Sequence, residues 1–510
     1  MPFFAENIVL TLEQPMITQT ETQQNTPELL QKIVAHAKEY GFVFPSSEIY
    51  DGLQAVYDYG QNGTELRNNL QQAWWKAMTQ LHEDIVGIDA AIFMHPTTWK
   101  ASGHVDSFSD PMIDNKDSNK RYRADMLLED KASAYERNGE PEKAQALLTK
   151  MNQLLEQEDL DGVRNLIIEE NIVCPISQTA NWTDVRQFNL MFSTQVGAVA
   201  DDANTVYLRP ETAQGIFVNY LNVQKTGRMK IPFGIAQVGK AFRNEVIARQ
   251  FIMRMREFTQ MEMQFFVAPG TEMEWYQTWK EKRMRWHQAL GTPAGKLRFH
   301  DHEKLAHYAN AACDIEFDFP IGFKEVEGIH SRTDFDLKSH ETFSKKKQRY
   351  ADPQEKTNYI PYVVETSIGL DRLFLLTLSN AYKETEYEDD KGNKKQRTFL
   401  SFHPALAPIK LAVFPLVKKG GLPEKARAIV EDLKYDFNVF YEERGAIGKR
   451  YTRQDLIGTP FCATVDFDTL EDEAVTIRYR DSTEQKRIKI TELRDLLTKE
   501  TSLNSILRQL

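Results

Sequence analysis

The chain has 510 residues, which is more than one hydrophobic core usually fills, and 41% of them are hydrophobic. We therefore expect two or more globular domains with substantial cores. The formal net charge of −11 argues against a protein that holds nucleic acid by indiscriminate electrostatic attraction, although it is compatible with a local basic surface. Residues 409–510 contain 18 Lys and Arg against 17 Asp and Glu, so the acidity belongs to the rest of the chain.

The cysteines and the N-terminus bear on metal sites and on the compartment. Cys174, Cys313 and Cys462 form no CxxC pair, which fits a reducing compartment, and we expect no structural zinc site. Residues 1–25 carry no targeting signal, and no later segment runs to about 18 apolar residues. We expect a cytoplasmic protein without a membrane segment, and we assign residues 1–40 to an N-terminal extension.

The first half of the chain contains two predicted helical regions. The spacing of apolar residues predicts a helix over residues 65–81, and the apolar run 86–96, closed by Pro96, predicts a strand after it. The apolar residues of that helix are Leu66, Leu70, Trp74, Ala77, Met78 and Leu81. Residues 121–170 are rich in Ala, Leu, Glu and Lys and are interrupted by the sequence NGEP, which predicts a charged helical hairpin, most simply a solvated appendage.

The second half changes character twice. Residues 206–376 contain several runs of period 2, which predict strands, and the charged stretch 383–398 predicts a solvated turn. Residues 402–410 hold two prolines in nine residues, Pro404 and Pro408, which indicates a linker. From Lys410 onward a strand, a helix and a strand alternate, as expected of a small α/β module.

Two segments, 234–245 and 254–266, carry many charges within what otherwise resembles half-buried strand. If they pair as antiparallel strands, alternation of side chains divides the second segment into a polar and an apolar face. The polar face holds Arg254, Arg256, Phe258, Gln260 and Glu262, and the apolar face holds Met255, Met261, Met263 and Phe265.

The simplest explanation of this pattern is an amphipathic ribbon whose ion pairs lie in water. Phe258 argues against it, because a ring in the middle of a polar face gains nothing unless a flat group stacks on it. Arginines, an aromatic platform and carboxylates together favour a site for a nucleotide and a cationic co-substrate.

The strand-loop-strand spacing resembles motif 2 of the class II aminoacyl-tRNA synthetases. Its residues are Phe242, Arg243, Glu245, Arg254, Phe258 and Glu262. The sequence YVVETSIGLDRLFLL (362–376) resembles motif 3 of that class, and residues 65–96 resemble motif 1, which builds the dimer interface in the family. The resemblance implies a homodimer with an α+β fold, in which an antiparallel sheet flanked by helices (41–402) is followed by a small α/β anticodon-binding domain (409–510).

Further stretches are similar to the glycyl-tRNA synthetases of the homodimeric type. They are GFVFPSSEIYDGLQAVYDYG (41–60), ASGHVDSF (101–108), FNLMF (188–192), LRPETAQGIF (208–217), EVEGIHSRTDFDL (325–337) and RYTRQDLIGTPFCATVD (450–466). They span nearly the whole chain from Gly41 onward. The resemblance implies ATP-dependent attachment of glycine to tRNA(Gly) through glycyl-adenylate, with release of AMP and pyrophosphate.

A glycine site must be small, negative toward the ammonium group and closed to any β-carbon. By resemblance, the glycine-contacting residues are Glu211, Glu262, Glu365 and Ser367. Because excluding a larger amino acid is sterically easier than excluding a smaller one, no editing site is required.

For ATP, the resemblance implies Arg243 on the α-phosphate, with Arg254 and Arg372 toward the outer phosphates. Arg243 and Arg372 are the expected catalytic residues. The resemblance further implies Phe258 stacking on adenine and Glu245, with Asn244 beside it, near the base. Glu325 is expected near ATP and its Mg²⁺, which takes hard oxygen ligands.

Several residues have two equally good interpretations. Arg209 and Arg332 suit either ATP binding or a salt-bridged scaffold, and we give His104 and His330 no catalytic role because each suits a structural histidine equally well. The basic segment 444–455 suits either a bent RNA strand or a solvated loop. Cys174 has no neighbouring thiol where some bacterial members have a cysteine pair, so the family's zinc site is not expected.

Two alternatives remain open at this point. The first is a non-catalytic relative that keeps the fold as a nucleic-acid-binding or accessory subunit, although such a protein has no reason to keep Arg243, Arg254 and Arg372. The second is a synthetase of the same subclass for histidine, threonine or proline. A zinc-held threonine would need His and Cys ligands on the sheet, where this chain has carboxylates and a serine.

Overall fold

The structure of the protein is a computed structural model that describes residues 26–197, 204–246, 250–303, 305–306, 308–351, 356–388 and 394–510. The predicted extension over residues 1–25 lies outside the described residues. Residues 27–39, the rest of the predicted extension, form a helix (α1, Pro27–Glu39) that packs Ile33 and Ala37 into the largest hydrophobic core. The division into domains that we expect from the sequence stays a prediction.

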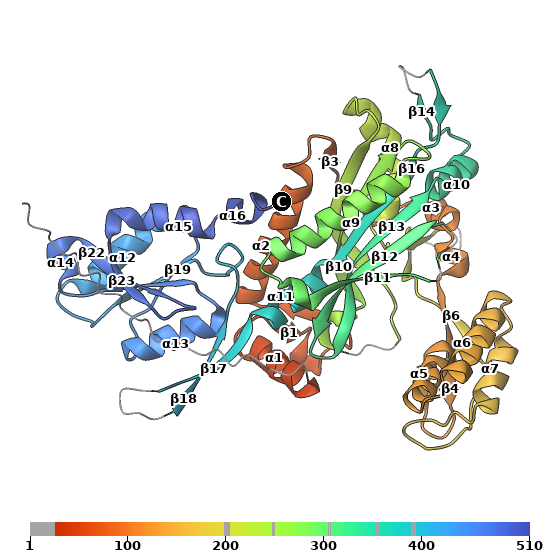
Figure 1. The fold of residues 1–510 in the computed structure, drawn as a ribbon, viewed down its shortest axis with the longest axis horizontal. Helices are drawn as coiled ribbons and strands as arrows, with labels where there is room; N and C mark the ends of the chain where they lie inside the picture. Colours follow the sequence, from red (N-terminus) through yellow and green to blue (C-terminus); the bar gives the residue numbers. More distant parts are fainter. Residues whose placement is uncertain are drawn as a thin grey trace, which may run out of the picture.

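A seven-stranded sheet forms the centre of the molecule (Figure 1). Its order is β11 (Leu297–Asp301), β12 (Ala311–Phe319), β13 (Gly322–Thr333), β16 (Tyr362–Gly369), β10 (Glu257–Val267), β9 (Phe233–Phe242) and β3 (Ile85–Gly87). All neighbours are antiparallel except β3 and β9, which are parallel. The predicted antiparallel sheet flanked by helices is therefore confirmed.

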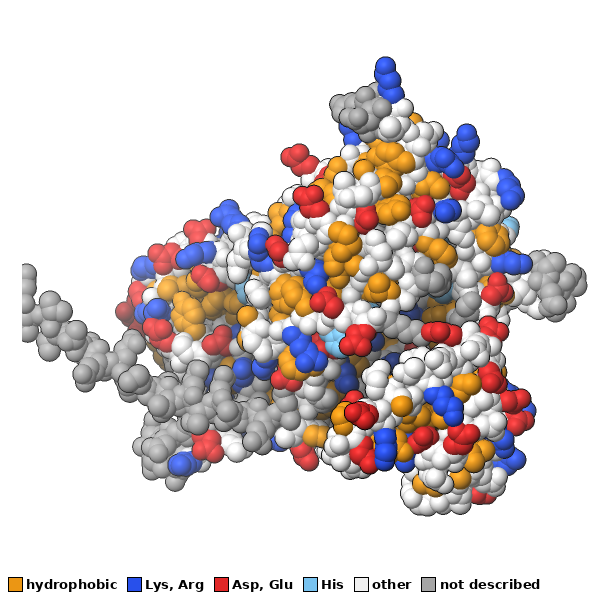
Figure 2. Space-filling model, turned by 45° about the vertical axis from the view of Figure 1, so that its right-hand side comes forward, with side chains coloured by type: hydrophobic (Ala, Val, Ile, Leu, Met, Phe, Trp, Pro, Cys, Tyr) orange, Lys and Arg blue, Asp and Glu red, His pale blue; other side chains and the backbone are white. Residues whose placement is uncertain are grey.

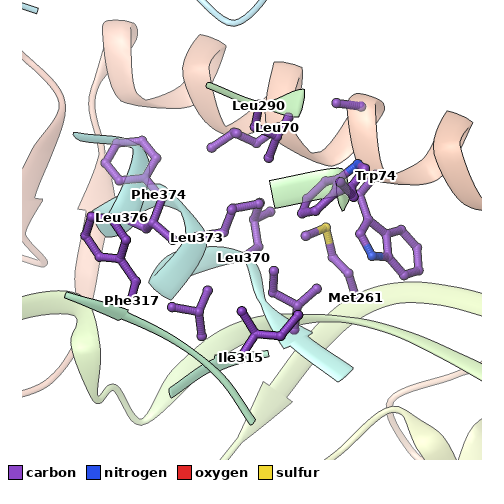
Figure 3. Packing of buried hydrophobic residues seen from close by; sticks show 14 of the residues in the cluster. Leu70, Trp74, Met261, Leu290, Ile315, Phe317, Leu370, Leu373, Phe374 and Leu376 are labelled. Atoms are coloured by element: carbon purple, nitrogen blue, oxygen red, sulfur yellow. The ribbon is translucent and has the colours of Figure 1, made fainter. Parts of the chain in front are cut away.

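Three helices cover one face of this sheet. They are α2 (Gln61–Thr79), α9 (Glu272–Ala289) and α11 (Leu370–Ala381). Met261 of β10 points into this core, near Trp74 and Leu370 (Figure 3), and Met263 belongs to the same core, as predicted from the alternation of β10. Burial of this apolar face fixes the register of β10, because a slip of one residue would turn the methionines to the other side.

The opposite face of the sheet is only partly covered. Helix α8 (Ala213–Thr226) packs Phe217 and Tyr220 against Phe233 of β9 and Phe266 of β10, at one end of the face that also carries Glu262. Helix α10 (Phe335–Ser344) contacts α8. The remaining part of this face, toward Phe258, is where the polar side chains of β10 and β16 meet.

The region predicted as helix and strand over residues 65–96 differs in its second part. Strand β3 ends at Gly87, and Pro96 is the first residue of a helix (α3, Pro96–Ala101) instead of the end of a strand, a position that proline favours. Leu81 lies beyond the end of α2 and is exposed, so it does not belong to the buried face of that helix.

Residues 121–170 are helical, as predicted, but they do not form a simple hairpin. The segment forms three helices, α5 (Ala124–Arg137), α6 (Pro141–Glu156) and α7 (Leu160–Glu169), packed on a sheet of β5 (Lys120–Arg123), β4 (Ser109–Asn115) and β6 (Arg186–Asn189). Leu128, Val163 and Trp182 belong to a core of its own, so this lobe is a small folded unit with a charged outer surface (Figures 1 and 2).

The structure corrects one prediction between residues 383 and 410 and refines another. The charged stretch forms a hairpin of β17 (Tyr382–Glu388) and β18 (Lys394–Leu400), because its threonines, tyrosine and phenylalanine supply strand positions between the charges. The segment 402–410 does connect two parts of the chain, but it is packed, since Phe402, Leu406 and Ala407 are buried in the core of the part that precedes it. We call this part, residues 26–402 without the three-helix lobe, the body.

The C-terminal domain (residues 410–510) is the expected α/β module. Its sheet has the order β20 (Val439–Tyr441), β19 (Leu411–Pro415), β21 (Phe461–Val465), β22 (Ala474–Tyr479) and β23 (Gln485–Lys489). Its helices are α12 (Leu422–Leu433), α13 (Ile447–Ile457), α14 (Thr469–Asp472), α15 (Leu493–Thr501) and α16 (Asn504–Leu507). Most of the basic segment 444–455 belongs to α13, and its Arg450 is buried against backbone carbonyls, so a solvated loop is excluded.

The remaining elements connect these parts. They are β1 (Val43–Pro45), β2 (Tyr57–Tyr59), α4 (His104–Ser107), β7 (Ser193–Gln195), β8 (Thr205–Tyr207), β14 (Tyr350–Ala351), β15 (Asn358–Tyr359) and 3₁₀ turns at Glu48–Tyr50, Phe251–Met253, Ala294–Lys296 and Ile490–Glu492. Within the described ranges, none of the helices combines the length and the apolar character that crossing a bilayer requires.

Candidate active site

A cavity of about 250 Å³ lies over the uncovered part of the polar face, where β10, β16 and β13 run side by side. Ten residues predicted for glycine or ATP line it: Glu211, Arg243, Glu245, Arg254, Phe258, Glu262, Glu325, Glu365, Ser367 and Arg372. Asn244 is the exception and does not line the cavity; its backbone N–H donates to the carbonyl of Leu190 at 2.8 Å.

Strand register explains how distant segments meet here. Glu262 of β10 stands opposite Ser367 of β16, and Glu365 of β16 stands opposite His330 of β13. The predicted strands were too long on one side, since Arg243 and Glu245 follow the end of β9 and Arg254 precedes β10. These three residues therefore lie on the connection between the strands, of which residues 247–249 are outside the described residues.

Glu365 is held on several sides at one end of the cavity, which we call the carboxylate end (Glu211, Glu262 and Glu365). It accepts hydrogen bonds from Arg332 at 3.0 Å and from Gln264 at 2.6 Å, and His330 Nδ1 lies 2.8 Å away. Burial alone raises the pKa of Glu365, but Arg332 and His330 outweigh it and bring the pKa to about 2. Glu365 is therefore a fixed negative charge.

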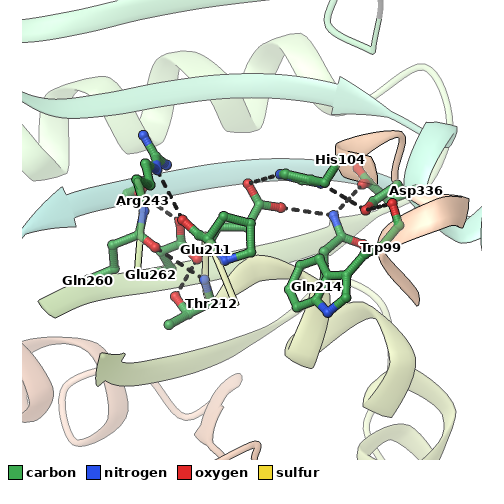
Figure 4. A network of polar contacts seen from close by, with 12 residues as sticks. Trp99, His104, Glu211, Thr212, Gln214, Arg243, Gln260, Glu262 and Asp336 are labelled. Carbon is green, nitrogen blue, oxygen red and sulfur yellow. Dashed lines mark hydrogen bonds and ion pairs between the residues drawn. The ribbon is translucent and has the colours of Figure 1, made fainter. Parts of the chain in front are cut away.

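Glu211 is fixed in a similar way (Figure 4). His104 Nε2 lies 3.4 Å from its carboxylate, and Gln214 donates to it at 2.9 Å. Burial raises the pKa of Glu211, but His104 and Arg332 overcome this effect and hold the pKa well below its usual value. The loop before α8 thus presents a second anion to the cavity.

Glu262 differs from the other two carboxylates. The contacts recorded for it among the described residues come from neutral donors: the hydroxyl of Ser367 donates at 2.8 Å, and the hydroxyl of Thr212 donates to its other oxygen. Burial, together with the charges of Glu365 and Glu211, raises the pKa of Glu262 to about 8. A cation entering the cavity would therefore gain most by contacting Glu262.

The other end of the cavity, which we call the arginine end, holds Arg243, Arg254 and Arg372. The guanidinium of Arg243 lies 5.3 Å from the centre of the Phe258 ring, and its Nε donates to the carbonyl of Pro210 at 3.1 Å. Arg372 pairs with Glu325 at 2.9 Å, whereas Arg254 lies 3.6 Å from Glu245. The ring of Phe258 is thus already in contact with the guanidinium of Arg243.

Sequence reasoning missed or left open several residues that shape the site. Thr212, Gln264 and Tyr308 were not predicted, although Thr212 is adjacent to Glu211 within a stretch already singled out. Arg332 lies in the cavity wall and forms buried ion pairs with Asp336 and Glu365, so it serves as scaffold and lining at once. Arg209 donates to backbone carbonyls of Lys240 and Ala90, which favours the scaffold interpretation.

No cluster of three or more His, Cys, Asp or Glu suited to a metal ion occurs within the described residues. Glu325 has a half-exposed carboxylate at the arginine end of the cavity, which suits an Mg²⁺ ion that arrives with a nucleotide and keeps most of its water ligands.

Three family models match the chain. The "tRNA synthetase class II core domain (G, H, P, S and T)" matches residues 193–381, the "Anticodon binding domain" matches residues 410–500, and the "Glycyl-tRNA synthetase insertion domain 1" matches residues 110–149 and 138–190. The last match covers the three-helix lobe. The non-catalytic accessory subunit receives no support from these matches.

Curated proteins named glycine–tRNA ligase match most of the chain. The protein of Chlorobaculum tepidum is 53% identical over 470 residues, which cover 92% of this chain and 99% of that protein. The Staphylococcus saprophyticus protein is 52% identical, covering 92% and 98%, and the Treponema denticola protein is 51% identical, covering 91% and 95%. The chain therefore belongs to the glycine–tRNA ligases, enzymes of the class II aminoacyl-tRNA synthetases.

Proposed function

We propose that the cavity over the polar face of the central sheet is the site where this ligase activates glycine with ATP, before the glycyl group passes to tRNA(Gly). The observation that carries the proposal is the charge division of one cavity: three carboxylates at one end, of which Glu262 and Glu365 are buried, and three arginines at the other. The ammonium group of glycine needs the carboxylate end, and the phosphates of ATP need the arginine end.

Glycine enters with its ammonium group at the carboxylate end. Glu262 takes the ammonium because Glu365 is already paired with Arg332 and Glu211 is already contacted by His104 and Gln214, while Ser367 holds Glu262 from the opposite strand. The Glu262 proton leaves as the ammonium binds. In this pose the glycine carboxylate points toward Arg243.

ATP lies along the arginine end. Arg243 contacts the α-phosphate, Arg254 and Arg372 contact the outer phosphates, and Phe258 stacks on adenine through the ring face that Arg243 does not cover. Glu245 lies near the base, and Glu325 supports the Mg²⁺ that the nucleotide brings.

The reaction needs no protein nucleophile. The glycine carboxylate attacks the α-phosphorus in line, pyrophosphate leaves, and the 3′-hydroxyl of the terminal adenosine of tRNA(Gly) then attacks the glycyl-adenylate and releases AMP. Positioning and neutralisation of charge at phosphorus supply the catalysis, which makes Arg243 and Arg372 the catalytic residues.

We also propose that the protein works as a homodimer through the region of α2 and β3. The support is the resemblance of residues 65–96 to motif 1, and light scattering of the purified protein tests it.

The first test of the site is amino-acid-dependent ATP–pyrophosphate exchange with each of the twenty amino acids and without tRNA. We expect exchange with glycine alone, and a loss of about 10²-fold or more in Arg243→Ala. Arg298→Ala is the matched control, because Arg298 also lies over a ring, that of Phe323 at 4.1 Å, but on the edge strand β11. Exchange with another amino acid, or equal losses in the two variants, would contradict the proposed site.

A further inference from the structure

The end of helix α13 in the C-terminal domain is held by the body through several polar contacts. Arg397 of β18 donates from Nε to Asp455 at 3.0 Å and from Nη2 to the carbonyl of Arg480 at 2.5 Å. His36 Nε2 of α1 lies 2.7 Å from the carbonyl of Leu456. We call Arg397, Asp455 and Arg480, with their contacts, the interdomain joint.

The C-terminal domain side of the joint is itself rigid. Arg478 donates two hydrogen bonds to Asp455, of 2.8 and 2.9 Å. The buried carboxylate of Asp455 is thus shared between Arg397 of the body and Arg478 of the C-terminal domain. Arg480, which is 2% exposed, donates to the carbonyls of Gly458 and Phe402, both at 2.7 Å. Charge-assisted bonds of this geometry, removed from water, resist small rotations.

The end of α13 also packs closely against the body, which leaves the C-terminal domain little room to rotate there. Gly458 ends α13 with a φ of +81°, and a Cβ at this position would lie 2.4 Å from the ring of Phe402. The segment that leads from the body to the domain is likewise pinned, because Lys410 Nζ donates to the carbonyls of Ala405 and Ala407 at 2.7 and 2.8 Å. The connection is thus a fitted contact rather than a flexible tether.

The joint is connected to the candidate active site by continuous regular structure. Arg372 lies in the cavity wall at the first turn of α11, and α11 ends at Ala381, directly before β17. Strand β17 pairs with β18 (Figure 1), and in their register Thr385 stands opposite Arg397. Helix α11 has twelve residues and is therefore about 18 Å long. Together with β17 and β18, it fixes the distance between the cavity and the C-terminal domain.

We propose that Arg397 is a positioning residue for the second half of the reaction. Resting on the proposed function, the joint fixes the C-terminal domain at the distance and angle at which one tRNA(Gly) contacts that domain while its acceptor end reaches the cavity. Without the contact of Arg397 with Asp455, the C-terminal domain stays covalently attached but is no longer held in one orientation. A tRNA bound to that domain then has its acceptor end at the cavity less often, because the effective concentration of that end at the cavity falls.

Three measurements on Arg397→Ala test this proposal. They are glycine-dependent ATP–pyrophosphate exchange without RNA, charging of full-length tRNA(Gly), and charging of a minihelix that contains only the acceptor arm. We expect exchange and minihelix charging to stay within about twofold of the unaltered protein, and kcat/KM for full-length tRNA(Gly) to fall about tenfold, the effect of one charge-assisted hydrogen bond. Arg397→Lys, which keeps the charge without the forked geometry, should recover part of the loss.

Arg487→Ala is the matched control. Arg487 also forms a forked pair with carboxylates, those of Asp466 and Asp472, but entirely within the C-terminal domain. We expect no change in any of the three measurements. Equal losses in all three with Arg397→Ala, or unchanged charging of full-length tRNA(Gly), would overturn the proposal. Absence of glycine-dependent exchange in the unaltered protein would instead contradict the proposed function.

A distance measurement keeps the test independent of RNA. The cysteines Cys174, Cys313 and Cys462 are buried, so dyes attach selectively to cysteines introduced at the exposed positions Glu274 of α9 and Lys499 of α15. We expect a broader distribution of energy-transfer distances in the Arg397→Ala background and an unchanged one in the Arg487→Ala background. An equally narrow distribution in both backgrounds would show that Arg397 does not hold the domain.

Discussion

The two ends of the cavity are built on different principles. At the carboxylate end, Glu262 and Glu365 are 3% exposed, and Glu211, Glu262 and Glu365 are all held by hydrogen bonds before any substrate arrives. At the arginine end, the side chains of Arg254 and Arg372 are 39% and 28% exposed, and Arg254 has its carboxylate partner at 3.6 Å. The first end is preorganised, whereas the second is adjustable chiefly at Arg254, since Arg243 and Arg372 also donate to backbone carbonyls.

Under the proposed function, this difference suits the two substrates. Glycine has no side chain and few rotatable bonds, so a rigid end excludes anything larger at no cost in its own binding. ATP is long, flexible and highly charged, so arginines that remain partly hydrated can follow its phosphates into place. A variant at the rigid end should therefore damage the fold as well as binding, whereas one at the adjustable end should affect binding alone.

The largest effect is expected from Arg332→Ala. Arg332 is buried and pairs with Asp336 at 2.9 Å and with Glu365 at 3.0 Å, so its removal leaves two buried carboxylates without their cation. Loss of one partner of a buried ion pair typically costs about 3–5 kcal/mol of folding free energy. Urea denaturation of the protein, followed by tryptophan fluorescence, should show a large decrease in the urea concentration at the midpoint of unfolding.

The matched control for this variant is Arg349→Ala. Arg349 also pairs with a carboxylate, that of Glu341 at 2.9 Å, but its side chain is 42% exposed, and pairs of this kind contribute about 0–1 kcal/mol. If Arg332→Ala were no more destabilising than Arg349→Ala, the carboxylate end would not be the rigid unit that its contacts indicate.

Sequence alone supplied the sheet that carries this site, because strand alternation is a local property. Residues 257–267 alternate between the methionine side and the side of Phe258 and Glu262, and no distant residue is needed to recognise that pattern. The grouping of Glu211, Glu262 and Glu365 is not local. It came from the family resemblance, because nothing in the spacing of the three residues brings them together.

The partners that set the charge of each carboxylate were beyond prediction. His104 and Glu211 lie more than a hundred positions apart, and their contact depends on how α3, which carries α4 after it, and α8 both pack against α10. The errors in the fold have a similar cause. The proline-rich segment 402–410 has the composition of a linker, but tertiary contacts bury Phe402 and Leu406, and composition carries no information about them.

The second prediction concerns pH and the difference between Glu262 and its two neighbours. The pKa of Glu262 is raised to about 8, so below that pH the empty site holds a proton that glycine must displace, whereas Glu211 and Glu365 are already ionised. The kcat/KM for glycine in the exchange reaction should therefore rise about tenfold per pH unit between pH 6 and 8 and level off above pH 8.

Two comparisons separate this effect from general pH dependence. The kcat/KM for ATP at saturating glycine should not follow the same slope, and Glu262→Gln should bind glycine more weakly with the slope removed. The stability of the folded protein should change with pH in the opposite direction. The raised pKa means that the folded state binds the proton of Glu262 more tightly than the unfolded state does. The contribution of Glu262 to the free energy of unfolding therefore decreases as pH rises from about 4.5 to 8. A glycine profile that is flat from pH 6 to 8 would place the ammonium elsewhere.

The smallest effect is expected at Arg254, where the adjustable end is most exposed. Arg254→Ala should raise the KM for ATP by roughly threefold to tenfold and change the urea midpoint little, because its contact with Glu245 is long and hydrated. Arg254→Lys should restore most of the affinity, since a hydrated arginine that follows a phosphate acts largely as a point charge. Lysine should not replace Arg243 in this way, because the guanidinium of Arg243 lies 5.3 Å from the centre of the Phe258 ring and also donates from Nε to the carbonyl of Pro210. If lysine failed equally at both positions, Arg254 would have a geometric role as strict as that of Arg243, and adjustability would be confined to Arg372.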